Sequence, residues 1–242
     1  MRKGLIAVIL VVLCALSSVV IYAAPSGPTS IGLGASSRYS GESNGALVNA
    51  LAGNVTQLDI NGTSITQGWQ GYFGNVLGTI VLGNNNNKTL YDWSLLAPSG
   101  QVYASRNSSV SWTTLNCSNQ TVMQNVIAAE EAALNFPVTA KDGINETFTS
   151  TSYPSFFVGS LNITANTCYN TNLHNSSGQK DATRWYEILL RDSSNGLVYT
   201  SLLENNGVGF DGSSYDFQMI VAEDGHNGDT STTPYYFWIE LQ

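Results

Sequence analysis

Three carboxylates in the second half of the chain have the residue type that acid–base catalysis needs. Glu187, Glu204 and Asp216 fall on or near neighbouring strand-like segments, and Trp185 is close to them in sequence. A glycosidase uses two such acids, about 5 to 10 Å apart, in a cleft lined by aromatic side chains. Because the spacing singles out no pair, we favour their interpretation as outward-facing or loop-facing hydrogen-bond acceptors.

Other catalytic signals are weak. The sequence contains neither a His-Glu-x-x-His zinc motif nor a Walker phosphate loop. Its two histidines, His174 and His226, both fall in polar stretches, which disfavours a serine–histidine–aspartate triad. We therefore predict that the protein is not an enzyme.

An acidic loop near the carboxyl end carries the densest group of oxygen donors. Its candidate ligands are Glu223, Asp224, Asn227 and Asp229. Calcium binds about six to eight oxygens from carboxylates, amides and backbone carbonyls. Because the spacing matches no EF-hand, a solvated turn is the favoured interpretation and a structural Ca²⁺ is the alternative. No other cofactor is expected.

An aromatic, glycine-rich stretch at residues 68–74 has the composition of a sugar-stacking platform. Trp69 and Tyr72 are its candidate ligand-binding residues. Glycines let aromatic rings lie flat against the backbone, which also suits a sheet corner packed on the core. The packed corner is the favoured interpretation.

The amino terminus has the pattern of an export signal. Arg2 and Lys3 precede a largely apolar run at residues 5–21, and Ala23 and Ala24 suit a signal peptidase. The run approaches the roughly 20 residues that can span a bilayer. Residues 1–24 are therefore predicted to be a signal peptide or a retained signal anchor, and both alternatives stay open. The rest of the chain is predicted to be extracellular or on the cell surface.

Two cysteines, Cys117 and Cys168, lie in the exported part. In an oxidising compartment such a pair most simply forms one disulfide, which would close a loop of about 50 residues and contribute about 3 to 4 kcal/mol. Two free buried thiols are the alternative. A zinc site is disfavoured because neither cysteine has a second Cys or His at ligand spacing.

Glycosylation signals are more frequent than chance would give. Nine Asn-x-Ser/Thr acceptors are present, and these predict a glycosylated exterior. They are Asn54, Asn61, Asn87, Asn107, Asn116, Asn119, Asn145, Asn162 and Asn175.

The charge balance excludes two classes of partner. The chain has 9 Lys and Arg against 17 Asp and Glu, a net charge of −8. Nucleic-acid binding depends on clustered cations that release counterions, and no such cluster follows Lys3. A basic membrane-surface patch is excluded for the same reason, so any membrane contact is expected only through the amino-terminal segment.

The local patterns predict an all-β fold, an antiparallel β-sandwich with one packed α-helix. Residues 25–44 have the Gly, Ser and Pro content of a flexible stalk, and 45–242 are predicted to form one domain. A helical turn is expected at 46–52 and a helix at 119–134. Strands are expected at 55–60, 76–82, 89–97, 101–105, 156–164, 185–191, 197–203, 215–222 and 235–241, and those at 76–82, 89–97 and 101–105 are predicted to pair as a meander. The strands at 185–191 and 197–203 are predicted to form a hairpin, because the Asn195-Gly196 pair between them suits a tight turn.

Three stretches resemble a family of archaeal exported proteins inferred from genomes. They are GWQGYFGNVLGTIVL at 68–82, TLYDWSLLAPSGQVYAS at 89–105 and YDFQMIVAEDGHNGD at 215–229. The similar motifs in that family are Trp-Gln-Gly-Tyr, Leu-Tyr-Asp-Trp and Asp-Phe-Gln-Met. The resemblance covers most of the exported part and implies a signal segment followed by one β-rich surface domain, with no catalytic residue or ligand attached.

Together these patterns predict a glycosylated, non-enzymatic protein of the cell surface with a structural or adhesive role. Its expected partners are the cell envelope or other surface proteins. Two alternatives stay open. The first is a filament subunit assembled by strand exchange, with residues 31–43 or an exposed edge strand completing a neighbour's sheet. The second is a carbohydrate-binding or carbohydrate-cleaving domain that uses Trp69, Tyr72 and Trp185.

Overall fold

The computed structural model describes residues 24–41, 44–117, 120–225 and 231–242. The regular structure is mostly β, and the strand pairings within these ranges are antiparallel. The predicted signal or anchor helix lies outside the described residues. None of the helices within the described ranges has the length and apolar content to cross a membrane.

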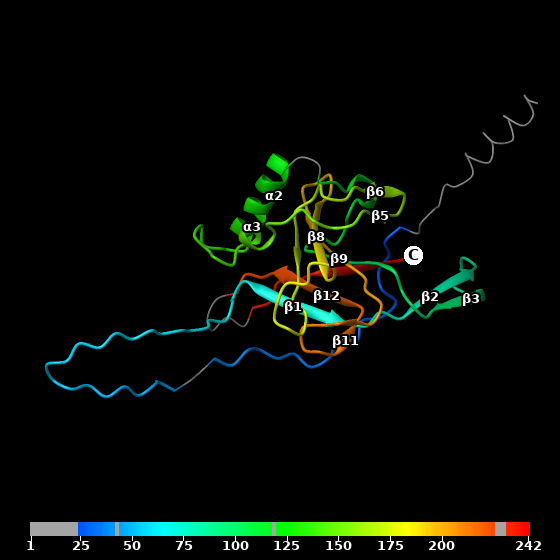
Figure 1. The fold of residues 1–242 in the computed structure, drawn as a ribbon. Helices are drawn as coiled ribbons and strands as arrows, with labels where there is room; N and C mark the ends of the chain where they lie inside the picture. The colour runs from blue at the N-terminus through cyan, green and yellow to red at the C-terminus, as the bar shows by residue number, and fades with distance from the viewer. Residues whose placement is uncertain (1–23, 42–43, 118–119, 226–230) are drawn as a thin grey trace, which may run out of the picture.

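The elements follow one another in a strand-rich order, shown in Figure 1. The strands are β1 Trp69–Gly74, β2 Gly78–Gly83, β3 Thr89–Leu95, β4 Gly100–Ser105, β5 Phe156–Val158, β6 Leu161–Ile163, β7 Asn170–Asn172, β8 Tyr186–Arg191, β9 Leu197–Leu202, β10 Gly207–Val208, β11 Ser214–Tyr215, β12 Phe217–Ala222 and β13 Tyr236–Leu241. The helices are η1 Trp112–Thr114, α2 Gln120–Ala133 and α3 Ile144–Thr147.

A five-stranded sheet in the order β13-β4-β9-β8-β7 forms the centre of the molecule. Strands β8 and β9 are the hairpin expected from the sequence. Asn195 adopts a left-handed conformation in its turn, with φ of 60°. The Asp192 carboxylate accepts hydrogen bonds from the Ser194 and Gly196 N–H groups, at 2.8 and 2.9 Å. The short polar side chain therefore satisfies backbone donors that the turn leaves unpaired.

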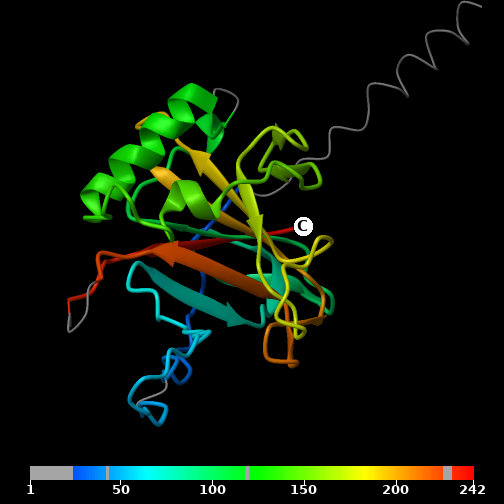
Figure 2. The same cartoon turned by 60° about the vertical axis from the view of Figure 1, so that its left-hand side comes forward.

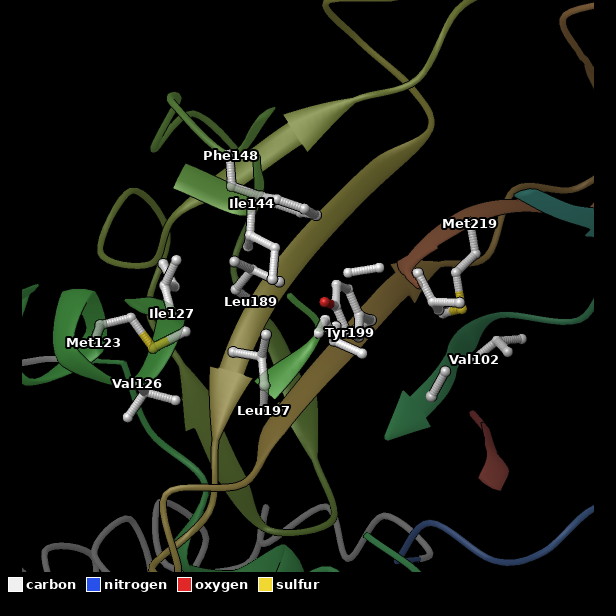
Figure 3. Close-up of a cluster of buried hydrophobic side chains, with 14 of the residues drawn as sticks. Val102, Met123, Val126, Ile127, Ile144, Phe148, Leu189, Leu197, Tyr199 and Met219 are labelled. Atoms are coloured by element: carbon white, nitrogen blue, oxygen red, sulfur yellow. The ribbon is translucent and has the colours of Figure 1, made fainter. Parts of the chain in front are cut away.

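One face of this sheet packs against α2 and against a two-stranded ribbon of β1 and β12. Alternate residues of the sheet, among them Leu189, Leu197 and Tyr199, enter this first core, because successive side chains of a strand point to opposite faces. Figure 3 shows them beside Met123 from α2 and Met219 from β12. The first core is therefore built from side chains of the central sheet, of α2 and of the β1–β12 ribbon.

The opposite face packs against the β5–β6 hairpin and the segments joined by the disulfide. The residues that alternate with the first set enter this second core, including Tyr103, Ile188 and Val198. Cys117 and Cys168 are buried among them. The central sheet is therefore covered on both faces, and Figure 2 shows elements on either side of it.

The helix predicted at 119–134 is confirmed as α2, with residue 119 itself outside the described residues. Met123, Val126 and Ile127 are its buried residues. This i, i+3, i+4 spacing puts them on one side of a helix, where they face the first core. The apolar stripe of α2 thus belongs to the hydrophobic core.

Four local predictions are wrong. The single strand expected at 156–164 is the β5–β6 hairpin, because the chain turns at Gly159, whose φ is 55°. Strand β3 pairs with β2 alone, and β4 pairs with β13 and β9, so residues 76–105 form no meander. Residues 55–60 form no strand, and residues 46–52 form no helical turn. A strand needs a neighbour to satisfy its N–H and C=O groups, and these residues have no strand beside them.

The amino-terminal end of the described chain meets the central sheet at its edge. The Ser26 N–H donates to the Ile239 carbonyl oxygen at 3.0 Å, and the Ile239 N–H donates to the Ser26 oxygen at 2.9 Å. Pro25 is buried beside this contact. Residues 27–66 then leave the body as a loop without strand or helix among their described members, and the chain returns to the body at β1. We call this loop the arm.

Candidate interaction site

Glu187 lies in no open cleft, and its predicted outward-facing or loop-facing position is wrong. Its side chain is fully buried between β8 and the ribbon, where Oε2 accepts a hydrogen bond from the Ile220 N–H at 3.0 Å. Oε1 has no hydrogen-bond partner among the described residues. Burial raises the pKa of the Glu187 carboxyl well above its ordinary value, and the Ile220 bond lowers it in part. The Glu187 carboxyl group therefore has a structural role, because it accepts a hydrogen bond from a backbone N–H group of β12.

The Asp216 side chain also binds backbone groups. The two Asp216 carboxylate oxygens accept from the Val76 N–H at 2.8 Å and the Asn206 N–H at 3.0 Å, so this buried side chain joins two loops. Glu204 is half-buried, and desolvation raises its pKa while the charge of Arg184 lowers it. None of the three acids lines the hollow of about 390 Å³ beside α2.

The three aromatic candidates contribute to packing. Trp69 lies against Phe136 and Phe148, with ring centroids 6.3 and 6.2 Å apart, and Tyr72 lies against Phe237 at 5.2 Å. Trp185, the third aromatic residue considered for sugar binding, is fully buried. A sugar therefore cannot stack on the Trp185 ring, whereas Trp69 and Tyr72 are half-buried.

The acidic loop is only partly described. Glu223 Oε1 accepts from the Thr233 hydroxyl at 3.0 Å, and Asp224 Oδ2 accepts from the Asn135 amide at 3.0 Å. Asn227 and Asp229 lie outside the described residues. Among the residues that the structure does describe, no three His, Cys, Asp or Glu side chains gather as metal ligands would.

Two short runs also match catalytic signatures, and neither has the required context. Residues 207–212 read Gly-x-Gly-x-x-Gly but form a β10–β11 hairpin, whereas a dinucleotide site needs a strand followed by a helix. Residues 41–45 read Gly-x-Ser-x-Gly, and their serine lies outside the described residues. The described residues around that serine, in the arm, form no strand or helix, whereas a nucleophile elbow is a strand-to-helix turn.

The most distinctive surface is the β2–β3 hairpin, which projects from the body in Figure 1. Ile80 pairs with Trp93 and Leu82 with Tyr91, so all four side chains lie on one face. They are 46 to 60% exposed. The other face carries Thr79, Val81, Asp92 and Ser94. The hairpin is therefore amphipathic, and its apolar face is open to solvent.

Hydrogen bonds close the turn of this hairpin. The Asn84 side-chain oxygen accepts from the Asn86 and Lys88 N–H groups, both at 3.0 Å. At the base, Leu95 and Leu241 lie directly over Gly78, so close that a Cβ there would collide with them. The apolar face therefore continues to the edge of the first core.

The arm is a second exposed apolar surface. Leu47, Val48 and Leu51 are 88, 57 and 73% exposed, and Ile60 is 85% exposed. A turn at the tip is closed by the Asn54 N–H, which donates to the Leu51 carbonyl oxygen at 3.2 Å. In Figure 1 the arm extends to the left of the body, while the hairpin projects to the right. The two surfaces therefore lie at opposite ends of the molecule.

The disulfide predicted from the sequence is confirmed. Cys117 and Cys168 are bonded across 51 positions, which fits an oxidising environment. Most of the predicted glycan acceptors are exposed, namely Asn54, Asn61, Asn87, Asn107, Asn145 and Asn162. Asn116 and Asn175 are half-buried, and Asn119 lies outside the described residues.

Comparison with known proteins adds no relative. No protein-family model matches this chain, and no curated protein or solved structure is significantly similar to it. The functional argument therefore rests on the residues of the chain itself.

Proposed function

We propose that this chain is an exported, non-enzymatic structural protein of the cell surface that works by contact with other surface proteins. The apolar face of the β2–β3 hairpin is the observation that carries this proposal. Large side chains gathered on a projecting element are typical of an interaction site, whereas singly scattered ones need no explanation. The candidate acids support the same conclusion, because Glu187 and Asp216 are buried and hold backbone groups.

Composition and covalent chemistry support the proposed location. The buried Cys117–Cys168 bond suits an oxidising compartment, and the exposed acceptors suit a glycosylated exterior. The resemblance to archaeal exported proteins points the same way. Intact mass and amino-terminal sequencing of the protein from its native envelope provide the test. We expect a disulfide-bonded, glycosylated chain in the envelope fraction, and recovery in the soluble lysate with reduced thiols would contradict the proposal.

A filament subunit assembled by strand exchange is the second candidate function. The arm favours it, because an extended segment with exposed apolar side chains is what strand addition to a neighbour requires. Within the predicted donor stretch 31–43, Ile31 and Leu33 are 59 and 89% exposed. Electron microscopy of the purified protein provides the test: this candidate predicts regular fibres that are lost in the double variant Ile31→Lys with Leu33→Lys, because both side chains belong to the predicted donor stretch.

A further inference from the structure

We infer that the apolar face of the β2–β3 hairpin is the docking site for residues 46–52 of a second copy of this chain. The inference rests on the proposed structural role and names the partner of that surface. It brings together the two exposed apolar elements described above, one as acceptor and one as donor.

The acceptor, the apolar face of the β2–β3 hairpin, is a surface on which another segment can pack. A two-stranded hairpin alone in water is marginally stable, and it gains stability when its apolar face is packed. The exposed side chains of the apolar face are Ile80, Leu82, Tyr91 and Trp93. At on the order of 100 Å² each, they present about 400 Å², which is about half of what one partner contributes to a standard interface and suits a short docking segment.

The donor matches that face in chemistry. Residues 46–52 read Ala-Leu-Val-Asn-Ala-Leu-Ala, and no charged residue occurs between positions 44 and 58. The segment contains no glycan acceptor, whereas Asn54 and Asn61 follow it. The apolar face of the hairpin also carries no charge, since Asp92 lies on the other face. The two surfaces can therefore lose water without burying an unpaired ion.

The position of the two elements makes the contact intermolecular. The tip of the arm and the hairpin lie at opposite ends of the molecule in Figure 1. A contact between different patches on two copies is heterologous, so each copy keeps one free donor and one free acceptor. Such contacts build a ring if the rotation closes and an open chain if it does not. The inference thus gives the proposed structural protein a way to assemble.

Sedimentation velocity of the full chain, purified in a mild detergent, provides the test. The acceptor variant is Ile80→Lys, and its matched control is Val81→Lys, the neighbouring residue on the other face with similar exposure. The donor variant is Leu47→Lys with Leu51→Lys. Its control, Asn44→Lys with Gln57→Lys, adds the same charge to the arm outside the docking segment.

We expect wild type and both controls to form oligomers as concentration rises, and each docking variant to associate at least about tenfold more weakly. Mixing the acceptor variant with the donor variant should restore one contact and give a species of two copies that grows no longer. Circular dichroism of each variant checks that the fold is retained.

Three results would overturn the inference: a wild type that stays monomeric, a donor variant that self-associates like the wild type, or a mixture of the two variants without two-copy species. The second result would indicate hairpin-to-hairpin dimers. In each case recovery of the protein from the native envelope leaves the proposed surface role standing, so the two proposals fail separately.

Discussion

Removal of the disulfide should cost this fold a large part of its stability. The Cys117–Cys168 bond encloses α2, α3 and the β5–β6 hairpin, which are elements that cover both faces of the central sheet. In the unfolded chain the bond restricts a loop of about 50 residues. The chain-entropy treatment gives about 4 kcal/mol for a loop of that length at 25 °C. A domain typically has about 5 to 15 kcal/mol in total.

The perturbation is the double change Cys117→Ala with Cys168→Ala, because a single change would leave a reactive thiol. Urea denaturation followed by far-ultraviolet circular dichroism measures the free energy of unfolding. We expect a loss of about 4 kcal/mol and a Tm lower by about 8 to 16 °C, at about 2 to 4 °C per kcal/mol for a chain of this size. The denaturant slope should rise, since the unfolded chain becomes more expanded.

Wild type unfolded in the presence of a reductant is the control, and its transition should coincide with that of the double variant. A loss below about 1 kcal/mol with an unchanged slope would refute the argument that this bond acts on the unfolded loop. A variant whose circular dichroism spectrum differs before denaturation would refute it in another way, by showing that the bond is needed to form the fold.

Two further changes test the interior. Glu187→Gln removes a carboxyl whose pKa burial raises above its ordinary value of 4.5. Below that pH both folded and unfolded chains hold the proton. Above it the wild type loses about 1.4 kcal/mol of stability for each further pH unit, until the folded chain also releases its proton. Thermal melts should therefore show a higher Tm for the variant at pH 8 and an equal Tm at pH 4; an equal difference at both would contradict this. Gly100→Ala places a Cβ against the Glu240 carbonyl oxygen at φ of +126°, so urea denaturation should show a loss of at least about 1 to 3 kcal/mol. Gly71→Ala, with no atom within 4 Å of its Cβ, is the control and should change little; equal losses would contradict the steric argument.

Local sequence patterns predicted the elements whose partners are near in the chain. The spacing of Met123, Val126 and Ile127 predicted the helix, and the Asn195-Gly196 turn signal between two strand-like segments predicted the β8–β9 hairpin. Local patterns did not predict strand pairs whose two members lie far apart in the sequence. Strand β1 pairs with β12 and β4 with β13, each across more than a hundred residues, and no local pattern states such a partner.

The candidate site was missed for a different reason, because the pairing of residues 76–82 with 89–97 was predicted but the side chains that share one face were not. The apolar face of the hairpin exists only because Ile80 pairs with Trp93 and Leu82 with Tyr91, which depends on register. The sequence did contain a signal for Glu187. Glu187 lies two positions before Leu189 on the same strand, so the two side chains point to the same face of the sheet. Because Leu189 is apolar and packs in the core, Glu187 is buried beside it. The acid could therefore have been predicted as a buried group.

The bridge between Ser26 and Ile239 limits how far the body can stand from a membrane. Only five positions separate Ser26 from Ile21, the last residue of the apolar run. A chain extends at most about 3.5 Å per residue, so a run retained in lipid would hold the folded body within about 18 Å of the bilayer. Residues 27–44 of the Gly, Ser and Pro stretch follow that tether and cannot lengthen it. An uncleaved copy would rest on the headgroups, and release by signal peptidase would be required before it could move away from them.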